Sequence, residues 1–233
     1  MKGPISTNYV QVSEEEARQQ YEAGLRDAWT DASLAEKQWE VVRPELELAR
    51  TGRPLLTYKA AVDCLRKVGA GERTILDVGA GCAHYADMIA IAKLPFAYTA
   101  FDFNPAFQNH ATARIPGLRY DLGNATKLPY KDGAFDIVFH SAVIMHMMDW
   151  KVAIGEAVRV SREWVLLHRT PIVLAKPTRY YVKEAYGVPC VEIHFWEADL
   201  IAAVREAGLK IAHTQHLFMD GQYGHRSYLL RKA

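Results

Sequence analysis

The residues best placed for chemistry lie in one stretch, where an apolar run gives way to glycines. Residues 74–85 read TILDVGAGCAHY. A β-prone run that carries Asp77 near its end and breaks at a Gly-Ala-Gly sequence predicts a strand, a tight turn and the start of a helix. Free backbone N–H groups at a helix N-terminus let a nucleotide-like ligand approach the main chain. Asp102 follows 21 residues after Gly81, close to the interval at which an acid binds ribose hydroxyls.

Two ligand classes fit this pattern: a nicotinamide or flavin dinucleotide, and S-adenosylmethionine. The dinucleotide turn needs a third glycine, because its helix packs close to the strand under a pyrophosphate. His84 occupies that place, and a bulky imidazole is hard to reconcile with pyrophosphate binding. S-adenosylmethionine carries no phosphate but has a cationic sulfonium and an amino acid tail. The pattern therefore favours S-adenosylmethionine.

The elements expected around this turn alternate between strand and helix. Strands are expected at 75–78, 97–101, 118–121, 135–139 and 164–167, with helices at 82–94, 105–114 and 150–162. Such alternation predicts a parallel sheet with helices on both faces. A helix at 197–207 and two strands at 209–218 and 226–230 complete the chain. We expect an α/β fold with a doubly wound, mostly parallel, seven-stranded sheet, whose last strand is antiparallel.

The chain on either side of this alternation has a different character. Residues 1–12 are expected to form a loose arm, and helices that begin at Ser13 and Leu34 form an N-terminal helical cap over residues 1–54. The Rossmann-like core is expected over residues 55–233. Within it, residues 170–196 break the rhythm with prolines and tyrosines. A long irregular insert of this kind is typically functional, so we expect it to help form a substrate pocket.

Composition bounds the class of protein. The chain has 233 residues, half of them hydrophobic, and a net charge of +1 from 28 basic and 27 acidic residues. This length and composition suit a single domain with a full core. The balanced charge provides no excess of basic residues to bind nucleic acid or an anionic membrane, so neither partner is expected. The oligomeric state is left open.

The cysteines and the N-terminus bear on location. Cys64, Cys82 and Cys190 lie far apart in the sequence and do not have metal-ligand spacing. Residues 1–4 carry no apolar core of a signal peptide. No stretch approaches the roughly 18 consecutive apolar residues that a membrane-spanning helix needs. No His and carboxylate cluster has ligand spacing either. We therefore expect a reduced, cytoplasmic setting and no metal.

Four blocks of sequence in a fixed order resemble the class I S-adenosylmethionine-dependent methyltransferases. They are LDVGAGCA at 76–83, AFDFNP at 100–105, GNA at 123–125 with LP at 128–129, and the run from FDIV at 135–138 to His146, extended by EAVRV at 156–160. The resemblance covers roughly residues 55–233. This chain departs from the family pattern at Ala83, where the family has its third glycine, and at Asn124, where the family has Asp.

The resemblance implies a binding role for nine residues. Asp77 would orient the ammonium of the methionine tail, Gly79, Ala80, Gly81 and His140 would line that tail, Asp102 would bind the ribose, Phe103 would lie against the adenine, and Asn124 and Ala125 would contact its edge. For several of these residues a purely structural role is an alternative to ligand binding. The glycines could form only a tight turn, Asp102 could cap the helix that begins at Pro105, and Asn124 could be a plain turn residue.

Histidines near the expected strand ends are the candidates for catalysis. Methyl transfer from a sulfonium is an in-line displacement that can need a base for the proton of the nucleophile. His146 is the first candidate for this base or for orienting the substrate. The alternative is that it belongs to the family signature without having that role. His168, at the end of the expected fifth strand, is the second candidate, and His194 is the third.

The insert supplies the candidates for binding the acceptor. Its aromatic side chains Tyr180, Tyr181, Tyr186, Phe195 and Trp196 could pack an organic acceptor. Its cations Lys176, Arg179 and Lys183 could meet a carboxylate or phosphate. Tyr21 and Trp29, from the N-terminal helices, could close the site as a lid. The alternative is that these aromatics form a local core and the charges a solvated face.

These observations predict an enzyme that transfers a methyl group from S-adenosylmethionine to a small molecule, with oxygen favoured over nitrogen. Nucleic-acid methylation is disfavoured, because the sequence after the fourth strand lacks an NPPY-type motif. Two alternatives stay open. One is a methyltransferase that acts on a protein or on a polysaccharide-linked sugar. The other is a non-catalytic module that binds S-adenosylmethionine.

Overall fold

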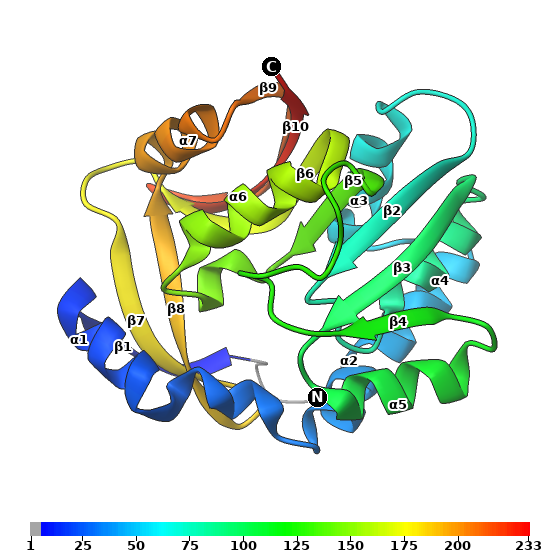
Figure 1. Cartoon of the computed structure of the whole chain (residues 1–233). Coiled ribbons are helices and arrows are strands. Elements are labelled where there is room, and N and C mark those ends of the chain that lie inside the picture. The colour runs from blue at the N-terminus through cyan, green and yellow to red at the C-terminus, as the bar shows by residue number, and fades with distance from the viewer. Residues whose placement is uncertain (1–5) are drawn as a thin grey trace.

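A twisted sheet forms the centre of the molecule (Figure 1). The computed structural model describes residues 6–233. The helices are α1 (Glu14–Gln20), α2 (Leu34–Arg50), α3 (Leu56–Arg66), α4 (His84–Ile91), α5 (Pro105–Arg114), α6 (Trp150–Val160) and α7 (Glu197–Glu206), with short helical turns η1 (Tyr21–Leu25), η2 (Asp27–Thr30) and η3 (Ile144–His146). The strands are β1 (Ser6–Val12), β2 (Arg73–Val78), β3 (Phe96–Asp102), β4 (Arg119–Leu122), β5 (Phe135–Ser141), β6 (Ser161–Val173), β7 (Arg179–Ala185), β8 (Val188–Trp196), β9 (Leu209–Asp220) and β10 (Tyr223–Lys232).

Seven of these strands form the expected core. Their order is β4-β3-β2-β5-β6-β10-β9. The pairs among the first five are parallel, and β10 is antiparallel to both β6 and β9. The prediction of an α/β fold with a mostly parallel sheet is therefore confirmed. The strand number is corrected, because residues 6–233 form ten strands in one sheet rather than seven.

Helices cover both faces of the central strands because the buried side chains of β2 and β5 alternate between the faces. Leu76 and Val138 pack with residues of α6 and α7 on one face. Ile75, Ile137 and Phe139 pack with residues of α2, α3 and α4 on the other. Strands that are buried on both sides read as continuous apolar runs, which is why these two strands could be located from sequence.

The insert is a regular β-hairpin, which corrects the expectation of irregular structure. Strands β7 and β8 pair antiparallel around a two-residue turn, in which Tyr186 and Gly187 both have positive φ (51° and 78°). Strand β6 runs on to Val173, far beyond the predicted end at residue 167, and its end pairs with β8 through Ile172 and Phe195. The extended β6 gives the hairpin an edge to join, so these residues enlarge the sheet.

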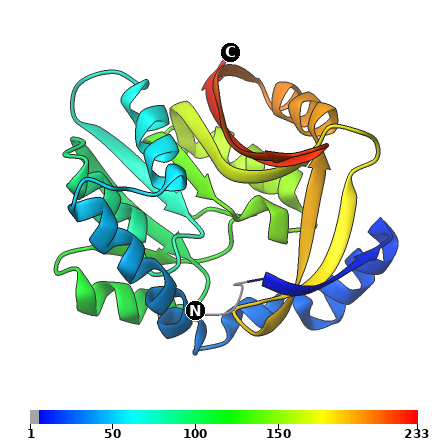
Figure 2. The ribbon, with the colours of Figure 1, turned by 180° about the vertical axis from the view of Figure 1, so that it is seen from behind.

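The N-terminal arm also belongs to this added sheet. Strand β1 pairs antiparallel with β7, with Val10 opposite Val182 and Val12 opposite Tyr180. Figure 2 shows β1, in blue, beside the yellow strands of the hairpin. Residues 6–12 are thus a strand and not the loose arm that the sequence predicts; residues 1–5 of that prediction lie outside the described part of the chain.

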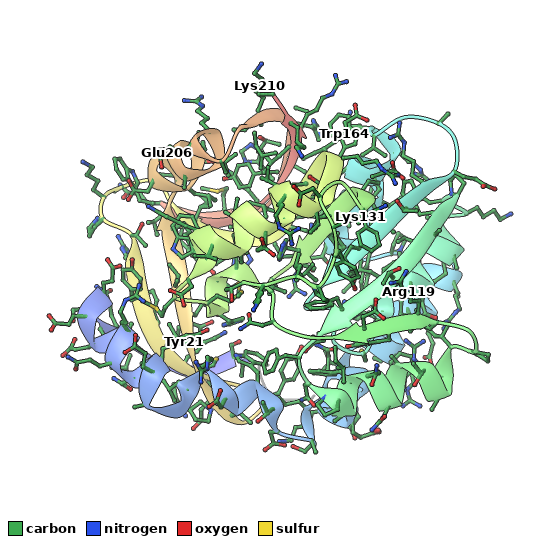
Figure 3. The ribbon with its side chains drawn as sticks, viewed as in Figure 1. Tyr21, Arg119, Lys131, Trp164, Glu206 and Lys210 are labelled. Atoms are coloured by element: carbon green, nitrogen blue, oxygen red, sulfur yellow. The ribbon has the colours of Figure 1, made fainter. Side chains whose placement is uncertain are left out.

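The N-terminal helices begin with the expected cap. The backbone N–H of Glu16 donates to Ser13 Oγ (3.2 Å), and the backbone N–H of Ser13 donates to Glu16 Oε2 (2.8 Å), which forms a capping box. The helix ends early, because Gly24 leaves the helical region (φ 137°). Tyr21 projects from the turn after α1 (Figure 3). Within residues 6–233, no helix combines the length and the apolar character that crossing a membrane would require.

A buried ion pair lies inside the added sheet. Lys183 of β7 and Glu192 of β8 form a salt bridge, and their side chains are 3% and 2% exposed. Glu192 also contacts His194 Nε2 (2.8 Å) and accepts from the Tyr9 hydroxyl (3.3 Å), while Lys183 donates to Ser6 Oγ (2.8 Å). Burial raises the pKa of Glu192, but His194 and Lys183 outweigh burial and hold this pKa well below its usual range. The pair therefore joins β7 to β8 and, through Tyr9 and Ser6, contacts β1.

Removing one partner of this pair tests its contribution to folding. We expect Glu192→Gln to lower the free energy of unfolding by about 3 kcal/mol, because Lys183 is left as a buried charge without a counterion. Urea unfolding at neutral pH measures this change. Glu184→Gln is the matched control on the exposed side of β7, and it should alter stability by less than about 0.5 kcal/mol. Equal stabilities for the two variants would contradict the assignment.

Candidate active site

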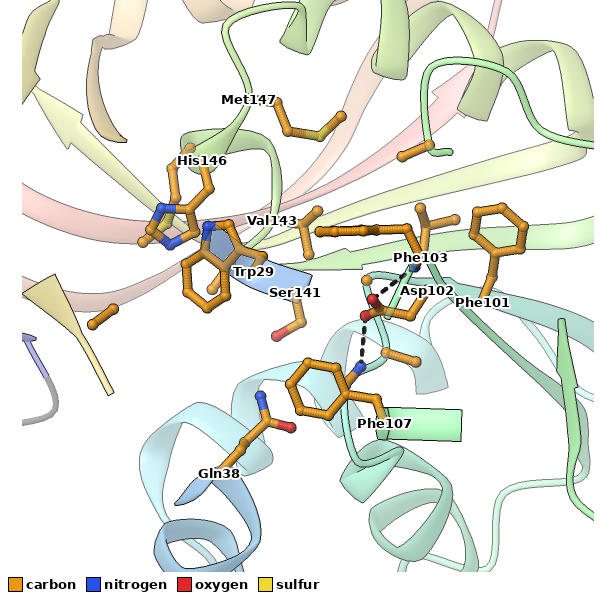
Figure 4. Close-up of a pocket in the computed structure, with 18 of the residues that line it drawn as sticks. Trp29, Gln38, Phe101, Asp102, Phe103, Phe107, Ser141, Val143, His146 and Met147 are labelled. Carbon is orange, nitrogen blue, oxygen red and sulfur yellow. Dashed lines mark hydrogen bonds between the residues drawn. The ribbon is translucent and has the colours of Figure 1, made fainter. Parts of the chain in front are cut away.

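A cavity of about 420 Å³ opens at the carboxyl ends of the central strands (Figure 4). It lies where β2 is flanked by β3 on one side and β5 on the other, the switch point at which ligands bind in open α/β sheets. The residues discussed below that line it are Tyr21, Trp29, Gln38, Asp77, Gly79, Ala80, Gly81, His84, Tyr85, Asp102, Phe103, Asn124, Ala125, Ser141, Ala142, Val143, Met145, His146, Met147, Arg169, Lys183 and Tyr186.

The glycine turn forms one wall of this cavity. Gly79 and Gly81 have φ values of 74° and 54°, and a Cβ atom at either position would overlap the side chain of Val143 or of Gln38, respectively. The backbone carbonyl of Phe101 accepts hydrogen bonds from the N–H groups of Gly79 (2.8 Å) and Ala80 (3.1 Å). The turn is therefore bound to the end of β3, and only glycine fits its conformation and its close neighbours.

Asp102 continues this connection between the turn and β3. Its Oδ2 accepts from the backbone N–H of Gly81 (3.1 Å), and its Oδ1 accepts from the N–H groups of Phe103 (2.7 Å) and Asn104 (3.1 Å). Burial raises the pKa of Asp102, while these three N–H groups oppose that rise. The cap of the following helix is Asn104, whose side chain accepts from Ala106 (2.8 Å). Asp102 is thus positioned by the turn and does not cap α5.

Asp77 has one carboxylate oxygen without a partner. The hydroxyl of Tyr98 donates to its Oδ2, whereas its Oδ1 is buried and makes no hydrogen bond. Burial raises the pKa of Asp77 to about 8, despite the hydrogen bond from Tyr98. A buried acceptor that lines a cavity and lacks a donor is typical of a ligand site. An ammonium group would supply both the missing donor and the compensating charge.

The opposite end of the expected cofactor site is more open. Phe103 is 44% exposed and lines the cavity together with Asn124 and Ala125. The side-chain oxygen of Asn124 accepts from the backbone N–H (2.9 Å) and the hydroxyl (2.8 Å) of Thr126. This is an Asx turn, so the side-chain carbonyl that was expected to face an adenine is used within the turn. Asn124 therefore acts here as a turn residue, which is the alternative role considered for it.

His140 lies outside the cavity, contrary to expectation. It is buried in β5 between Val78 and Leu167 of the neighbouring strands, and neither ring nitrogen has a hydrogen-bond partner. Burial lowers the pKa of His140 to about 4. Ser141 and Ala142, the next two residues, line the cavity instead. Side chains alternate along a strand, so a shift of one residue exchanges the buried and the cavity-facing positions.

His146 lines the cavity with its unprotonated nitrogen available. Its Nδ1 lies 2.7 Å from the backbone carbonyl oxygen of Val191. A carbonyl can only accept, so Nδ1 carries the proton and Nε2 keeps a lone pair. Burial lowers the pKa of His146 to about 4, which keeps the ring neutral. Its ring lies 4.8 Å from that of Trp29, between centroids, and Figure 4 shows both across the cavity from Phe101 and Phe103.

The other two candidate histidines do not reach this cavity. His168 is buried in the middle of the long β6, with Nδ1 2.6 Å from Ser227 Oγ, so it does not stand at the edge of the sheet where it was expected. His194 belongs to the ion pair of Glu192 and stacks on Tyr223 (4.7 Å between ring centroids). With Tyr9, Arg179, Tyr181 and Tyr223 it lines a second hollow.

The expected acceptor residues are divided between the cavity and other places. Tyr21 and Tyr186 line the cavity, and Lys183 reaches it while paired with Glu192. Tyr180, Tyr181 and Trp196 do not, which corrects their expected role as pocket residues. Tyr181 lines the second hollow, and Trp196 lies under Lys176, whose Nζ is 4.5 Å from the ring centroid. Successive tyrosines on a strand point to opposite faces, so the hairpin could not present them all to one pocket.

Gln38 and Arg169 are cavity residues that the sequence did not reveal. The side-chain oxygen of Gln38 accepts from the backbone N–H of Cys82 (2.7 Å), so α2 closes over the glycine turn. Only its position on the buried side of an amphipathic helix could have indicated it. Arg169 follows the predicted end of its strand, where no sequence pattern separates it from a loop residue. Among residues 6–233, no group of three or more His, Cys, Asp or Glu is arranged to hold a metal ion.

Part of the chain matches the model of a known protein family. Residues 76–164 match the family described as "Methyltransferase domain". A probable phthiotriol/phenolphthiotriol dimycocerosates methyltransferase 2 of Mycobacterium ulcerans is 33% identical over 138 residues, which are 58% of this chain and 46% of that protein. An uncharacterized methyltransferase of Mycobacterium sp. (strain JLS) is 36% identical over 93 residues, 40% of this chain and 36% of that protein. The chain thus spans less than half the length of either relative.

A solved structure resembles the whole chain. It is the 1,6-didemethyltoxoflavin-N1-methyltransferase of Burkholderia thailandensis, with bound 1,6-didemethyltoxoflavin and S-adenosylhomocysteine. The TM-score is 0.58 at 16% identity, and the match covers 100% of this chain and 93% of that one. At this identity the likeness establishes the fold. Together with the matched domain, it confirms the predicted resemblance to class I S-adenosylmethionine-dependent methyltransferases.

The buried histidines predict how stability depends on pH. The pKa of His140 is about 4 in the folded chain and about 6.5 in an unfolded one, so the unfolded chain binds more protons between these values. The free energy of unfolding should therefore fall as pH drops from 6.5 toward 4, by up to about 1.4 kcal/mol per pH unit for this residue. We expect His140→Leu to flatten that slope by about one proton, as measured by urea unfolding at several pH values. An unchanged slope would show that His140 does not titrate in this way.

Proposed function

We propose that this chain, which carries a class I S-adenosylmethionine-dependent methyltransferase domain, transfers the methyl group of S-adenosylmethionine to a hydroxyl oxygen of a small organic molecule. One observation carries the proposal. A single cavity brings together the glycine turn, the unpartnered oxygen of Asp77 and the free Nε2 of His146. The first two features suit the methyl donor, and the third suits a group that loses a proton.

The residues of the turn fit the methyl donor. The Oδ1 of Asp77 would accept from the ammonium of the amino acid tail, because it is the buried acceptor that lacks a donor. Gly79 and Gly81 line the cavity with backbone alone, so a tail can lie against the main chain. Asp102 and Phe103 would face the ribose and the adenine, as the family resemblance implies. Asn124 would line the site, but its side-chain carbonyl would not bind the adenine.

His146 supports oxygen as the acceptor atom. Bound S-adenosylmethionine supplies an electrophilic methyl group on its sulfonium. As the acceptor oxygen bonds to that carbon, the C–S electron pair passes to sulfur and the hydroxyl proton passes to His146 Nε2. The carbonyl of Val191 holds the ring in the tautomer that can accept this proton. A neutral amine reacts through its own lone pair and needs no base, so a positioned neutral histidine favours a hydroxyl.

The cavity lining supports an acceptor with an apolar body. Trp29, Val143, Met145 and Met147 line the cavity together with His146, and pockets for organic molecules are lined in this way. The relatives are named for methylating phthiotriol dimycocerosates and 1,6-didemethyltoxoflavin, which are organic acceptors. A cavity that continues past the turn to His146 also supports an enzyme over a module that only binds the cofactor.

Binding of the methyl donor tests the first half of this proposal. We expect calorimetry to show binding of S-adenosylhomocysteine by the intact chain, and Asp77→Asn to weaken it by about 10- to 100-fold. This is the loss expected when a charge-assisted hydrogen bond disappears. Asp63→Asn, on the outer side of α3, is the matched control and should leave the dissociation constant unchanged. Failure of the unmodified chain to bind would refute the proposed function.

Turnover tests the second half. A panel of phenols and hydroxy acids with a radiolabelled methyl group on the donor would identify a usable acceptor. With that acceptor, we expect His146→Gln to lower kcat by at least about 100-fold, because the proton loses its acceptor in the transition state. The dissociation constant for S-adenosylhomocysteine should stay within about two-fold, since His146 lies beyond the turn. Unimpaired kcat in this variant would remove His146 from the mechanism.

A further inference from the structure

Arg169 reaches the cavity through an irregularity in β6. Leu167 pairs with Tyr228 and Thr170 pairs with Arg226, so two residues of β6, His168 and Arg169, lie opposite the single residue between them on β10. This is a β-bulge, which redirects a side chain from the regular alternation of a strand. Arg169 has a φ of 56°, a left-handed conformation that costs free energy for any residue with a Cβ. Strain at a cavity-lining side chain is typical of a functional position.

The guanidinium of Arg169 has no acidic partner. Among the described residues, no carboxylate lies within 4 Å of it, whereas the other cavity cations are paired, Arg26 with Asp27 (2.9 Å) and Lys183 with Glu192. Its surroundings are phenols. Burial lowers the pKa of Arg169, but Tyr85, Tyr186 and Tyr58 outweigh burial, so this pKa lies above its usual value.

The nearby acid is already engaged. Glu45 of α2 also raises the pKa of Arg169, yet its Oε2 accepts from the hydroxyl of Tyr58 (2.9 Å) and it makes no ion pair with the guanidinium. Asp77, which also lines the cavity, has its pKa raised to about 8 by burial, so at neutral pH it is largely protonated before a cation binds. The cavity therefore holds one positive charge that the chain itself leaves without a counterion.

We infer that Arg169 is an anchor for a carboxylate group of a ligand in this cavity. A planar guanidinium can hold both oxygens of a carboxylate, and the hydroxyls of Tyr85 and Tyr186, which also line the cavity, can donate further hydrogen bonds. A partly buried cation without a counterion opposes folding unless a ligand compensates it. The inference rests on the proposed function and extends it, because the carboxylate belongs either to the amino acid tail of the methyl donor or to an acidic group on the acceptor.

Calorimetry with three probes separates these two sources. S-adenosylhomocysteine carries the tail carboxylate, 5′-methylthioadenosine lacks the amino acid, and benzoate added to the S-adenosylhomocysteine complex represents an acidic acceptor. The variants are Arg169→Gln and Arg169→Lys, the second of which keeps the charge in case the first folds poorly. Arg205→Gln, on the exposed side of α7, is the control for the change in net charge. Thermal unfolding verifies that each variant is folded.

Each outcome decides the inference. If the tail supplies the carboxylate, Arg169→Gln weakens the binding of S-adenosylhomocysteine by at least about ten-fold and leaves the affinity for 5′-methylthioadenosine unchanged. The affinity of Arg169→Lys for S-adenosylhomocysteine then lies between those of the unmodified chain and Arg169→Gln. If the acceptor supplies it, both nucleoside affinities persist, and benzoate binds the complex of the unmodified chain but not that of the variant. The inference is overturned if Arg169→Gln changes none of these affinities, or if it weakens both nucleosides equally. Absence of S-adenosylhomocysteine binding by the unmodified chain would instead refute the proposed function.

Discussion

The turn after β2 depends on hydrogen bonds from the neighbouring strand, and the rest of the site depends on that turn. The carbonyl of Phe101 binds the N–H groups of Gly79 and Ala80, and Asp102 binds the N–H of Gly81. These bonds connect the loop before α4 to the end of β3, so Asp77 and Asp102 lie on either side of the glycine turn. The left-handed glycines make the arrangement sterically possible. Every binding role proposed for this wall depends on these hydrogen bonds.

The added sheet of β1, β7 and β8 gives the cavity its other side. Strand β8 places the carbonyl of Val191 against His146 and so selects the tautomer of that ring. Strand β7 carries Lys183, and the turn between the strands carries Tyr186. The buried pair of Lys183 and Glu192 joins these two strands. The wall proposed for the methyl donor thus comes from the core of the fold, and the added strands supply the residues that face it.

The sequence predicted the core because its signals are local. The glycine turn, the apolar runs of β2 and β5 and the capping box at Ser13 each arise from a few adjacent residues. The hairpin was not predicted, because its strands depend on the distant end of β6 and on β1, which adds at the hairpin's other edge. The same limit applies to single residues. His140 and Ser141 exchange roles through a shift of one position along a strand, and Arg169 enters the cavity only because a bulge forms opposite β10.

A crystal structure of the intact chain with S-adenosylhomocysteine would test the central claim most directly. The account predicts that the product ammonium lies within hydrogen-bond distance of Asp77 Oδ1, about 2.7 to 3.2 Å. It also predicts that the sulfur faces the space bounded by Trp29 and His146 Nε2. A ligand bound elsewhere, or a sulfur that points away from His146, would contradict the account.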